Sequence, residues 1–185
     1  MGENREQIIE SAIALFNKNG IQGATISQIA KAVGISKGTL YYYFRTKSEL
    51  LDTCFDYVKK NAIRITLNRI DYSLTPKDVI YDLVKHALTW PLEKPGEMEF
   101  LDKYISHHFN EEKSFNLFSF NLFDNEIGGE RMSLVVKDCP LTLVNFLIGD
   151  ILTSVVKFVR IYPQYQGDEK FLETISKMIW DMISK

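Results

Sequence analysis

Five residues between positions 37 and 42 have side chains suited to contact with a double helix: Lys37, Gly38, Thr39, Tyr41 and Tyr42. A lysine neutralises a phosphate, a threonine hydrogen-bonds a base edge or touches a thymine methyl group, and a tyrosine hydroxyl reaches a phosphate oxygen. A glycine lets the backbone approach closely. This combination predicts contact with a nucleic-acid groove, provided that one element presents all five residues together.

Two short helices are expected to position this segment. Thr25 and Gln28 are spaced as a reciprocal capping box, in which each side chain accepts a hydrogen bond from the other residue's backbone N–H. Gly34 suits the left-handed conformation that often ends a helix, and Ser36 is placed to cap the next one. The apolar residues of the first helix recur at helical spacing: Ile26, Ile29, Ala30 and Val33. The pattern predicts a helix-turn-helix.

The second of these helices has an inner and an outer face. Leu40 and Phe44 are four residues apart and share the face expected to pack on the first helix. Adjacent helical positions point about 100° apart, so Tyr41, Tyr42 and Tyr43 cannot all be buried in so small a domain. We assign Tyr43 and Phe44 to the core and expect at least one of the other tyrosines to face outward.

Flanking helices are expected to complete a small core. Thr46, with Glu49 three residues later, caps a helix that opens at Lys47, where the lysine and the helix N-terminus can meet a phosphate together. Upstream, Asn4 is expected to cap a first helix that ends at Asn19-Gly20. The apolar residues of that first helix share one face: Ile8, Ile9, Ala12, Ile13, Leu15 and Phe16.

Charge is distributed unevenly along the chain. The 185 residues have a formal net charge of -2, which argues against a nonspecific nucleic-acid coat. Between Glu10 and Glu49, however, there is no acidic residue. The basic residues of that stretch are Lys18, Lys31, Lys37, Arg45 and Lys47. A phosphate-facing N-terminal part and a more acidic remainder are therefore expected.

These residues together resemble a known family. Residues 4–51, above all Gly-Ile-Ser-Lys-Gly-Thr-Leu-Tyr-Tyr-Tyr-Phe at 34–44 followed by Lys47, are similar to the DNA-binding domain of the TetR family of bacterial transcriptional regulators. One departure is Gln28, where the family often carries an acid. The resemblance implies that the residues approaching DNA are Thr25, Ser27, Lys37, Gly38, Thr39, Tyr41, Tyr42 and Lys47.

The remainder of the chain reads as further helices separated by proline and glycine. We expect an all-α protein, with a helix-turn-helix DNA-binding domain at 1–46 and a helical regulatory and dimerisation domain at 47–185 that begins with a connecting helix at 47–70; the resemblance implies about nine helices in all. For residues 114–127 the partial alternation leaves a short strand open, but we favour a helix. The other expected helices run over 75–91, 95–109, 140–161 and from Gly167 to near the C-terminus.

The segment 140–161 is apolar and long enough to raise the question of a membrane span. Asn145, Asp150 and Lys157 interrupt it, and a carboxylate near its middle would cost several kcal/mol in hydrocarbon. Cys54 and Cys139 are far apart and lack the spacing of metal ligands, and the polar start is unlike a signal peptide. We therefore expect a cytoplasmic protein with no membrane association, no metal and no cofactor.

The last two helices carry more apolar faces than one small domain hides. The resemblance implies that they pair with a second copy in a four-helix bundle, which makes a homodimer. A two-fold axis would place two recognition helices on matching half-sites, so the expected partner is double-stranded DNA with a palindromic operator.

The middle of the chain is rich in aromatic side chains. Most of them suit a core, but the resemblance implies an apolar cavity for a small-molecule inducer, and aromatic walls suit a flat or apolar ligand. His86, His107 and His108 could contact such a ligand or a metal, although surface or core histidines are the simpler interpretation. The residues we select as candidates for ligand contact are Trp90, Phe100, Tyr104, His107, Phe118 and Phe123.

The sequence has no phosphate-binding glycine loop and no His-Glu-x-x-His, so we do not expect an enzyme. The resemblance implies a ligand-responsive repressor that leaves its operator when an apolar or aromatic molecule binds. The alternative is a similar DNA-binding protein that acts as a structural or cell-division partner without an inducer. An enclosed cavity in the second domain would distinguish the two.

Overall fold

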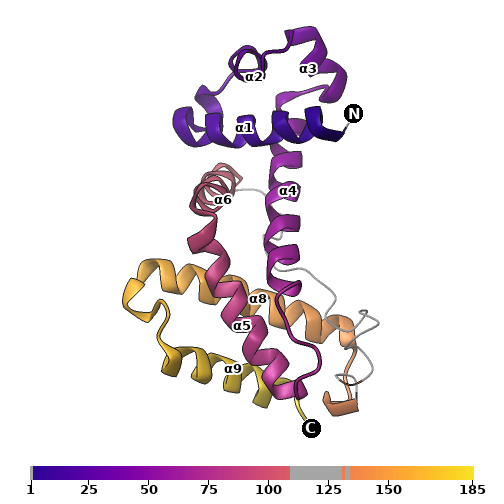
Figure 1. Cartoon of the computed structure of the whole chain (residues 1–185), viewed down its shortest axis with the longest axis vertical. Coiled ribbons are helices and arrows are strands. Elements are labelled where there is room, and N and C mark those ends of the chain that lie inside the picture. The colour runs from indigo at the N-terminus through magenta and orange to yellow at the C-terminus, as the bar shows by residue number, and fades with distance from the viewer. Residues whose placement is uncertain (1, 109–130, 132–133) are drawn as a thin grey trace. The chain divides into compact units, whose positions relative to one another are not determined.

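The structure is a computed structural model that describes residues 2–108, 131 and 134–185. Within these residues the regular structure is helical, apart from an isolated antiparallel bridge between Val136 and Ser184. The expected all-α fold class is confirmed. The elements in Figure 1 are α1 (Gly2–Gly23), α2 (Ile26–Val33), α3 (Lys37–Tyr43), α4 (Lys47–Leu67), α5 (Pro76–Glu93), α6 (Pro95–His107), α8 (Leu141–Ile161), the 3-10 helix η1 (Pro163–Tyr165) and α9 (Glu169–Ile183).

The chain forms two compact units. The first unit is Met1–Lys60 with Lys94–Phe115, and the second unit is Asn61–Glu93 with Asn116–Lys185. Helix α4 therefore begins in the first unit and ends in the second. Helix α6 packs with the N-terminal helices, although it lies far from them in sequence. The expected division into a DNA-binding domain at 1–46 and a regulatory domain at 47–185 concerns function and stays a prediction.

The first unit is built on α1, against which α2 packs. Asn4 does not cap α1, because the helix already begins at Gly2. The expected interruption at Gly20 is present: its φ of 73° and ψ of 162° break the helical path before Gly23. Glycine is favoured there because the left-handed half of backbone space penalises a Cβ. The core residues of this unit include Ile8, Ala12, Phe16, Ile29, Leu40, Phe44, Leu50 and Cys54.

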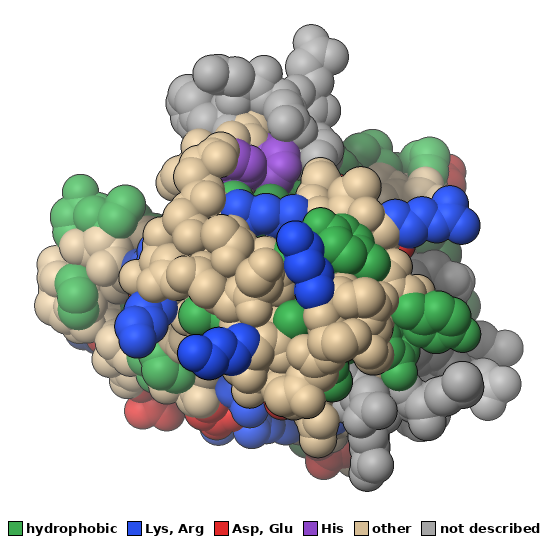
Figure 2. All heavy atoms as spheres, turned by 90° about the horizontal axis from the view of Figure 1, so that it is seen from above, with side chains coloured by type: hydrophobic (Ala, Val, Ile, Leu, Met, Phe, Trp, Pro, Cys, Tyr) green, Lys and Arg blue, Asp and Glu red, His purple; other side chains and the backbone are tan. Residues whose placement is uncertain are grey.

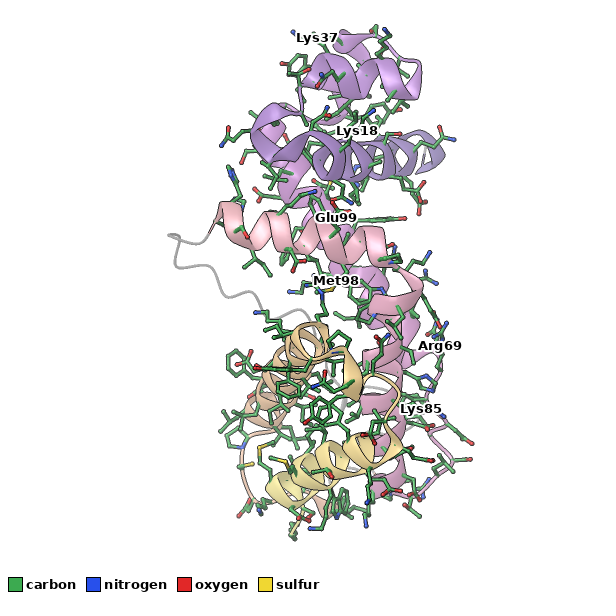
Figure 3. The ribbon with its side chains drawn as sticks, turned by 90° about the vertical axis from the view of Figure 1, so that its left-hand side faces the viewer. Lys18, Lys37, Arg69, Lys85, Met98 and Glu99 are labelled. Carbon is green, nitrogen blue, oxygen red and sulfur yellow. The ribbon has the colours of Figure 1, made fainter. Side chains whose placement is uncertain are left out.

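Helix α6 packs on α1 (Figure 3). Polar and aromatic contacts hold the two helices together. Asn17 Nδ2 donates to the Gly96 carbonyl at 2.7 Å, and Lys103 Nζ donates to the Asn17 carbonyl. The rings of Phe16 and Phe100 lie 6.0 Å apart between centroids. Because these contacts join α6 to the same helix that supports α2, α6 is part of the first unit's framework.

In the second unit, α5 packs on α8 and α9. The predicted start of α5 is confirmed: Pro76 is its first residue, and the Thr75 hydroxyl accepts the Asp78 backbone N–H at 3.3 Å. Proline suits this position because the first helical N–H has no partner within the helix. Asp168 caps α9 in the same way, accepting the Phe171 N–H at 3.2 Å.

The predicted end of α5 at Pro91 is two residues short. The helix continues through Pro91 to Glu93, even though a proline removes one backbone hydrogen bond. Arg69 donates two hydrogen bonds to the Glu93 carboxylate, at 2.8 and 2.7 Å, and so holds the last turn. Lys94 is then the only residue before Pro95 opens α6.

Helix α8 begins after Pro140 and ends at Ile161, as predicted. It is long and apolar enough to cross a membrane by length and composition alone, but half of its apolar window is buried inside the protein, as in a core helix. Its buried side, which includes Val144, Ile148 and Leu152, supplies the core of the second unit. The helix expected over 114–127 lies outside the described residues.

Candidate nucleic-acid interface

The capping box that opens α2 is formed as predicted. The Thr25 hydroxyl accepts the Gln28 N–H at 3.2 Å, and Gln28 Oε1 accepts the Thr25 N–H at 2.9 Å. At the other end Gly34 has a φ of 77° and donates its N–H back to the last turn of α2. These two devices fix the length of α2 and the sharp turn after it.

Helix α3 is anchored by its inner face. Leu40 and Phe44 are fully buried, whereas Lys37, Gly38 and Thr39 are exposed. Ser36 caps the helix by accepting the Thr39 N–H at 3.0 Å, and the hydroxyls of Ser36 and Thr39 are 2.8 Å apart. The Thr39 hydroxyl therefore already has a hydrogen-bond partner within the protein, while its methyl group remains available for contact.

The three consecutive tyrosines are distributed as the helical geometry requires. Tyr41 is 42% and Tyr42 77% exposed, and Tyr43 is half-buried with its ring edge-on to Tyr42 at 5.6 Å. Lys37 Nζ lies 5.9 Å from the centroid of the Tyr41 ring. The expectation that at least one tyrosine faces outward is confirmed.

Lys47 lies at the first position of α4 and is tied to the N-terminal helices. Its Nζ donates to the Gln22 carbonyl at 3.2 Å, and partial burial lowers the pKa of its ammonium group. Thr46 accepts the Glu49 N–H at 3.0 Å, as predicted. The Glu49 carboxylate accepts the N–H of Arg45 at 2.8 Å, one residue earlier than in a reciprocal box. Sequence reasoning missed Gln22, because a backbone acceptor 25 residues from Lys47 leaves no local pattern.

Thr25 and Ser27 are also exposed, beside the buried Ile26 and Ile29. Together with the α3 residues and Lys47 they make up the proposed DNA face, which we define as Thr25, Ser27, Lys37, Gly38, Thr39, Tyr41, Tyr42 and Lys47. Figure 2 shows basic side chains spread over the face turned to the viewer, with acidic side chains at its margins. The acid-free run between Glu10 and Glu49 accounts for this within the first unit.

The candidates for ligand contact are divided between the units. Trp90 is fully buried in the second unit, whereas Phe100 and Tyr104 are buried in the first. Tyr104 donates its hydroxyl to Asp52 Oδ1 at 2.7 Å and stacks on Phe55 at 4.4 Å. Phe118 and Phe123 lie outside the described residues. A ligand-binding role for any of these residues stays a prediction.

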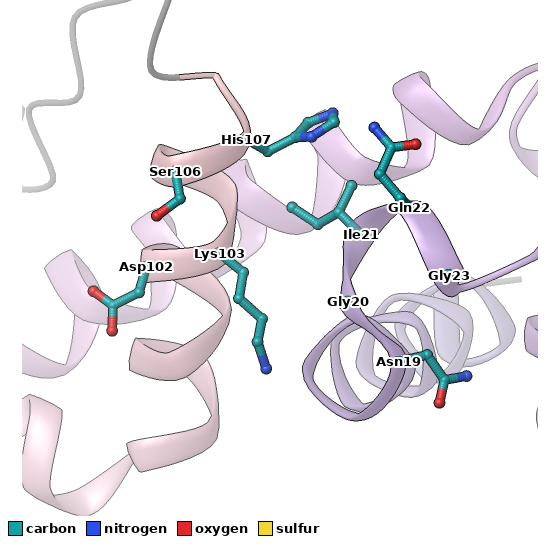
Figure 4. A pocket seen from close by; sticks show the side chains of 9 residues that line it. All are labelled: Asn19, Gly20, Ile21, Gln22, Gly23, Asp102, Lys103, Ser106 and His107. Carbon is teal, nitrogen blue, oxygen red and sulfur yellow. The ribbon is translucent and has the colours of Figure 1, made fainter.

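His107 is exposed and lines a groove in the first unit (Figure 4). The groove has a volume of about 430 Å³ and lies between the end of α1 and the last turns of α6. Its lining residues are Asn19–Gly23, Asp102, Lys103, Ser106 and His107. In the described part of the chain, no group of three or more His, Cys, Asp or Glu side chains is placed to hold a metal ion.

A comparison with protein families finds a match in the N-terminal part of the chain. Residues 8–54 match the model of the bacterial regulatory proteins of the tetR family, and this range contains the whole proposed DNA face. Residues 8–54 thus form a domain of the tetR family of bacterial regulatory proteins.

Two bacterial transcriptional regulators are similar to part of the chain. The biofilm operon icaADBC HTH-type negative transcriptional regulator IcaR of Staphylococcus aureus (strain Newman) is 37% identical over 84 residues, which are 43% of each chain. The HTH-type transcriptional regulator AcrR of Shigella flexneri is 28% identical over 87 residues, 46% of this chain and 40% of AcrR. The matches thus span less than half of the length of these relatives.

The likeness of fold extends over nearly the whole chain. A crystal structure of a putative tetR family transcription regulator from Shewanella sp. PV-4 has a TM-score of 0.70, at 18% identity and 98% coverage of both chains. At that identity the likeness shows the TetR-like fold alone.

Proposed function

We propose that this TetR-family protein is a transcriptional repressor that binds a palindromic operator as a homodimer and is released by a small, largely apolar or aromatic ligand. The observation that carries the proposal is the exposed outer face of α3, where Lys37, Tyr41 and Tyr42 project from a helix whose inner face is fully buried. Repression rather than activation is supported by IcaR, which is a negative transcriptional regulator. We place this activity in the cytoplasm.

DNA binding follows from the chemistry of the proposed DNA face. Lys37 and Lys47 supply cations for phosphates, and the N-terminus of α4 adds its backbone dipole beside Lys47. Thr39 presents a methyl group suited to thymine, and Gly38 lets the helix come close to the bases. Phosphate contacts fix the register of the protein, whereas Thr39 is assigned to base readout.

Dimerisation is supported by one side of α8. Five of its exposed apolar residues are separated by three, four or eleven positions, which places them on one side of the helix as a stripe. They are Leu143, Phe146, Leu147, Phe158 and Ile161. The opposite side of α8 is buried in the second unit, so a second copy can cover the stripe without disturbing the core.

Release by a ligand requires that the two binding events oppose each other. Helix α4 starts at the proposed DNA face with Lys47 and ends in the second unit. A ligand that favours another position of α4 therefore changes the spacing between the two DNA-binding domains of the dimer. Two half-sites must lie about 34–36 Å apart to meet successive major grooves. A small change in that spacing is therefore sufficient to weaken binding.

Selection of binding sites from a pool of randomised duplexes tests the proposal. The expected result is an enriched sequence with two-fold symmetry, bound by two copies of the chain. Thr39→Ser removes the methyl group and keeps the hydroxyl, so it tests the assigned base readout: it should change the preferred base more than the affinity for random DNA. A pool in which no sequence is enriched would contradict operator binding.

A further inference from the structure

Helices α5 and α9 pack side by side in the second unit (Figure 1), and a groove follows their contact. One part of the groove has a volume of about 550 Å³, and a second part of about 290 Å³ continues toward the 3-10 helix η1. The two parts adjoin, because Tyr81 and Glu169 line both of them. Small-molecule sites in proteins have volumes of roughly 300–1,000 Å³, so the groove is large enough for a ligand.

The part near η1 is walled mainly by apolar side chains. It is lined by Leu92 of α5, which is 52% exposed, by Val159 of α8 and by Leu172 of α9. Tyr165 of η1 adds an aromatic ring, whose centroid lies 5.1 Å from that of the Phe171 ring. An apolar or aromatic group bound here removes apolar surface from water, which favours binding.

The junction of the two parts is negatively charged. Glu169 and Glu173 lie one turn apart on α9, and both are exposed. Burial raises the pKa of the Tyr81 hydroxyl, and the carboxylates of Glu169 and Glu173 raise it further, so both carboxylates lie close to this hydroxyl. Like charges four residues apart on a helix repel each other. A cation placed between the two carboxylates and Tyr81 relieves that repulsion.

The basic residues of the groove leave these two carboxylates uncompensated. Three lysines line the groove: Lys77, Lys85 and Lys177. Among the described residues neither Glu169 nor Glu173 has an ion-pair partner, and Lys177 is paired with Asp181 instead. The charged groups that shift the pKa of Tyr81 are all carboxylates, so negative charge dominates the junction.

We propose that this groove binds an organic cation with an apolar or aromatic body, such as a quaternary ammonium compound. The cationic group lies between the Glu169 and Glu173 carboxylates and the Tyr81 ring, whose face attracts a cation. The apolar body occupies the part of the groove beside Leu92 and Tyr165. The inference goes beyond the proposed function, because a ligand in this groove need not alter operator binding.

Benzyltrimethylammonium and dimethylbenzylcarbinol test the proposal, because the two molecules have nearly the same shape and only the first is charged. NMR titration of isotope-labelled protein should give an affinity about tenfold higher for the cation, since exposed ion pairs and a ring contact each contribute modestly. The backbone amide signals that move should belong to α5, η1 and α9. Phenylacetate, which carries the opposite charge, should bind more weakly than the carbinol.

The double variant Glu169→Gln with Glu173→Gln removes both charges and keeps the shape of the side chains. Both residues are exposed, so the variant should fold normally. The cation should then bind no better than the carbinol, whose own affinity should stay the same. Asp56→Asn with Asp138→Asn is the matched control, because it removes two exposed carboxylates outside the groove and should keep the preference for the cation.

Equal affinities of the unaltered protein for benzyltrimethylammonium and the carbinol would overturn the proposal, as would a cation that fails to bind. An equal loss of preference in the control variant would show that only net charge matters, and signals that move elsewhere would place the site outside the groove. Binding of phenylacetate as tight as that of the cation would assign the groove to its lysines. Operator DNA is absent from these titrations, so failure here leaves the proposed repressor function untouched.

Discussion

At the residue scale, the exposed polar groups of the proposed DNA face differ in how firmly the protein already holds them. The Thr39 hydroxyl is paired with Ser36, and Lys47 Nζ is paired with the Gln22 carbonyl. Lys37 instead rests near the Tyr41 ring, an interaction that an exposed cation exchanges readily with solvent or phosphate. Substitutions at these positions should therefore separate binding from stability.

Lys37→Ala should weaken operator binding and leave the free energy of unfolding nearly unchanged, because the side chain is exposed and contributes little to packing. Loss of one phosphate contact should also reduce the slope of log affinity against log salt concentration by about one. Fluorescence anisotropy at several salt concentrations measures both. Lys170→Ala, on the exposed surface of α9, removes the same charge elsewhere, and an equal effect from it would show that only net charge matters.

Lys47→Ala should affect both properties. It removes a phosphate contact and also the hydrogen bond to Gln22, whose loss should lower the free energy of unfolding by about 1 kcal/mol. Urea unfolding followed by circular dichroism gives the stability, and anisotropy gives the affinity. Normal stability with weakened DNA binding would mean that the Gln22 bond is unimportant and that Lys47 serves the DNA alone.

At the element scale, the sequence predicts best what is decided within a few residues. The caps at Thr25, Ser36 and Thr75 and the turn at Gly34 were predictable because each depends on a side chain three residues from its partner or on one backbone angle. The extension of α5 past Pro91 was not predictable, since it is held by Arg69 in the turn that follows α4.

The packing of α6 on α1 likewise depends on residues that are far apart in the sequence. Asn17 and Gly96 are 79 residues apart, and no local sequence pattern predicts their hydrogen bond. Phe100 and Tyr104 were selected as candidates for ligand contact because the segment is rich in aromatic residues, and the structure shows that they pack against α1 and α4. Their role in ligand binding stays a prediction. Aromatic content alone does not reveal which helix an aromatic side chain will meet.

Tyr104→Phe tests whether this packing stabilises the first unit. The change keeps the ring and its stacking on Phe55 but removes the hydroxyl that donates to Asp52 at 2.7 Å. The free energy of unfolding should fall by about 1–2 kcal/mol, because the acceptor is a carboxylate. The matched change Tyr162→Phe, at an exposed position in the second unit, should have almost no effect, and an equal loss in both variants would argue against the Asp52 bond.

At the scale of the whole molecule, the surplus of apolar surface in the last helices was predictable from composition, but its location was not. Ile179 on α9 belongs by sequence to that surplus, yet it is fully buried within its own unit. A charge at Ile179 should therefore unfold the second unit instead of separating two copies. The exposed stripe of α8 is the surface on which dimerisation can be tested.

Leu147→Glu places a charge in that stripe at a residue that is 38% exposed. If a second copy covers Leu147, the variant should sediment as a monomer. It should also bind the operator much more weakly, because a monomer has one DNA-binding domain and contacts one half-site. Leu134→Glu is the matched control, because Leu134 is 74% exposed and lies outside α8. A Leu147→Glu protein that remains dimeric would place the interface on another surface.

Ligand and operator should influence each other equally if the proposed function is correct. Allosteric couplings of about 1–3 kcal/mol correspond to a 5- to 150-fold change in affinity, and the factor by which a ligand weakens operator binding must equal the factor by which the operator weakens ligand binding. The test uses an apolar compound found by a thermal-shift screen. Titrating that compound with and without saturating operator measures the second factor, and titrating operator with and without the saturating compound measures the first. A factor above one in both titrations would show that ligand and operator binding oppose each other, and linkage requires the two factors to agree. Equal ligand affinities with and without operator would mean that this compound is no inducer, and the alternative of a DNA-binding structural partner without an inducer would then be favoured.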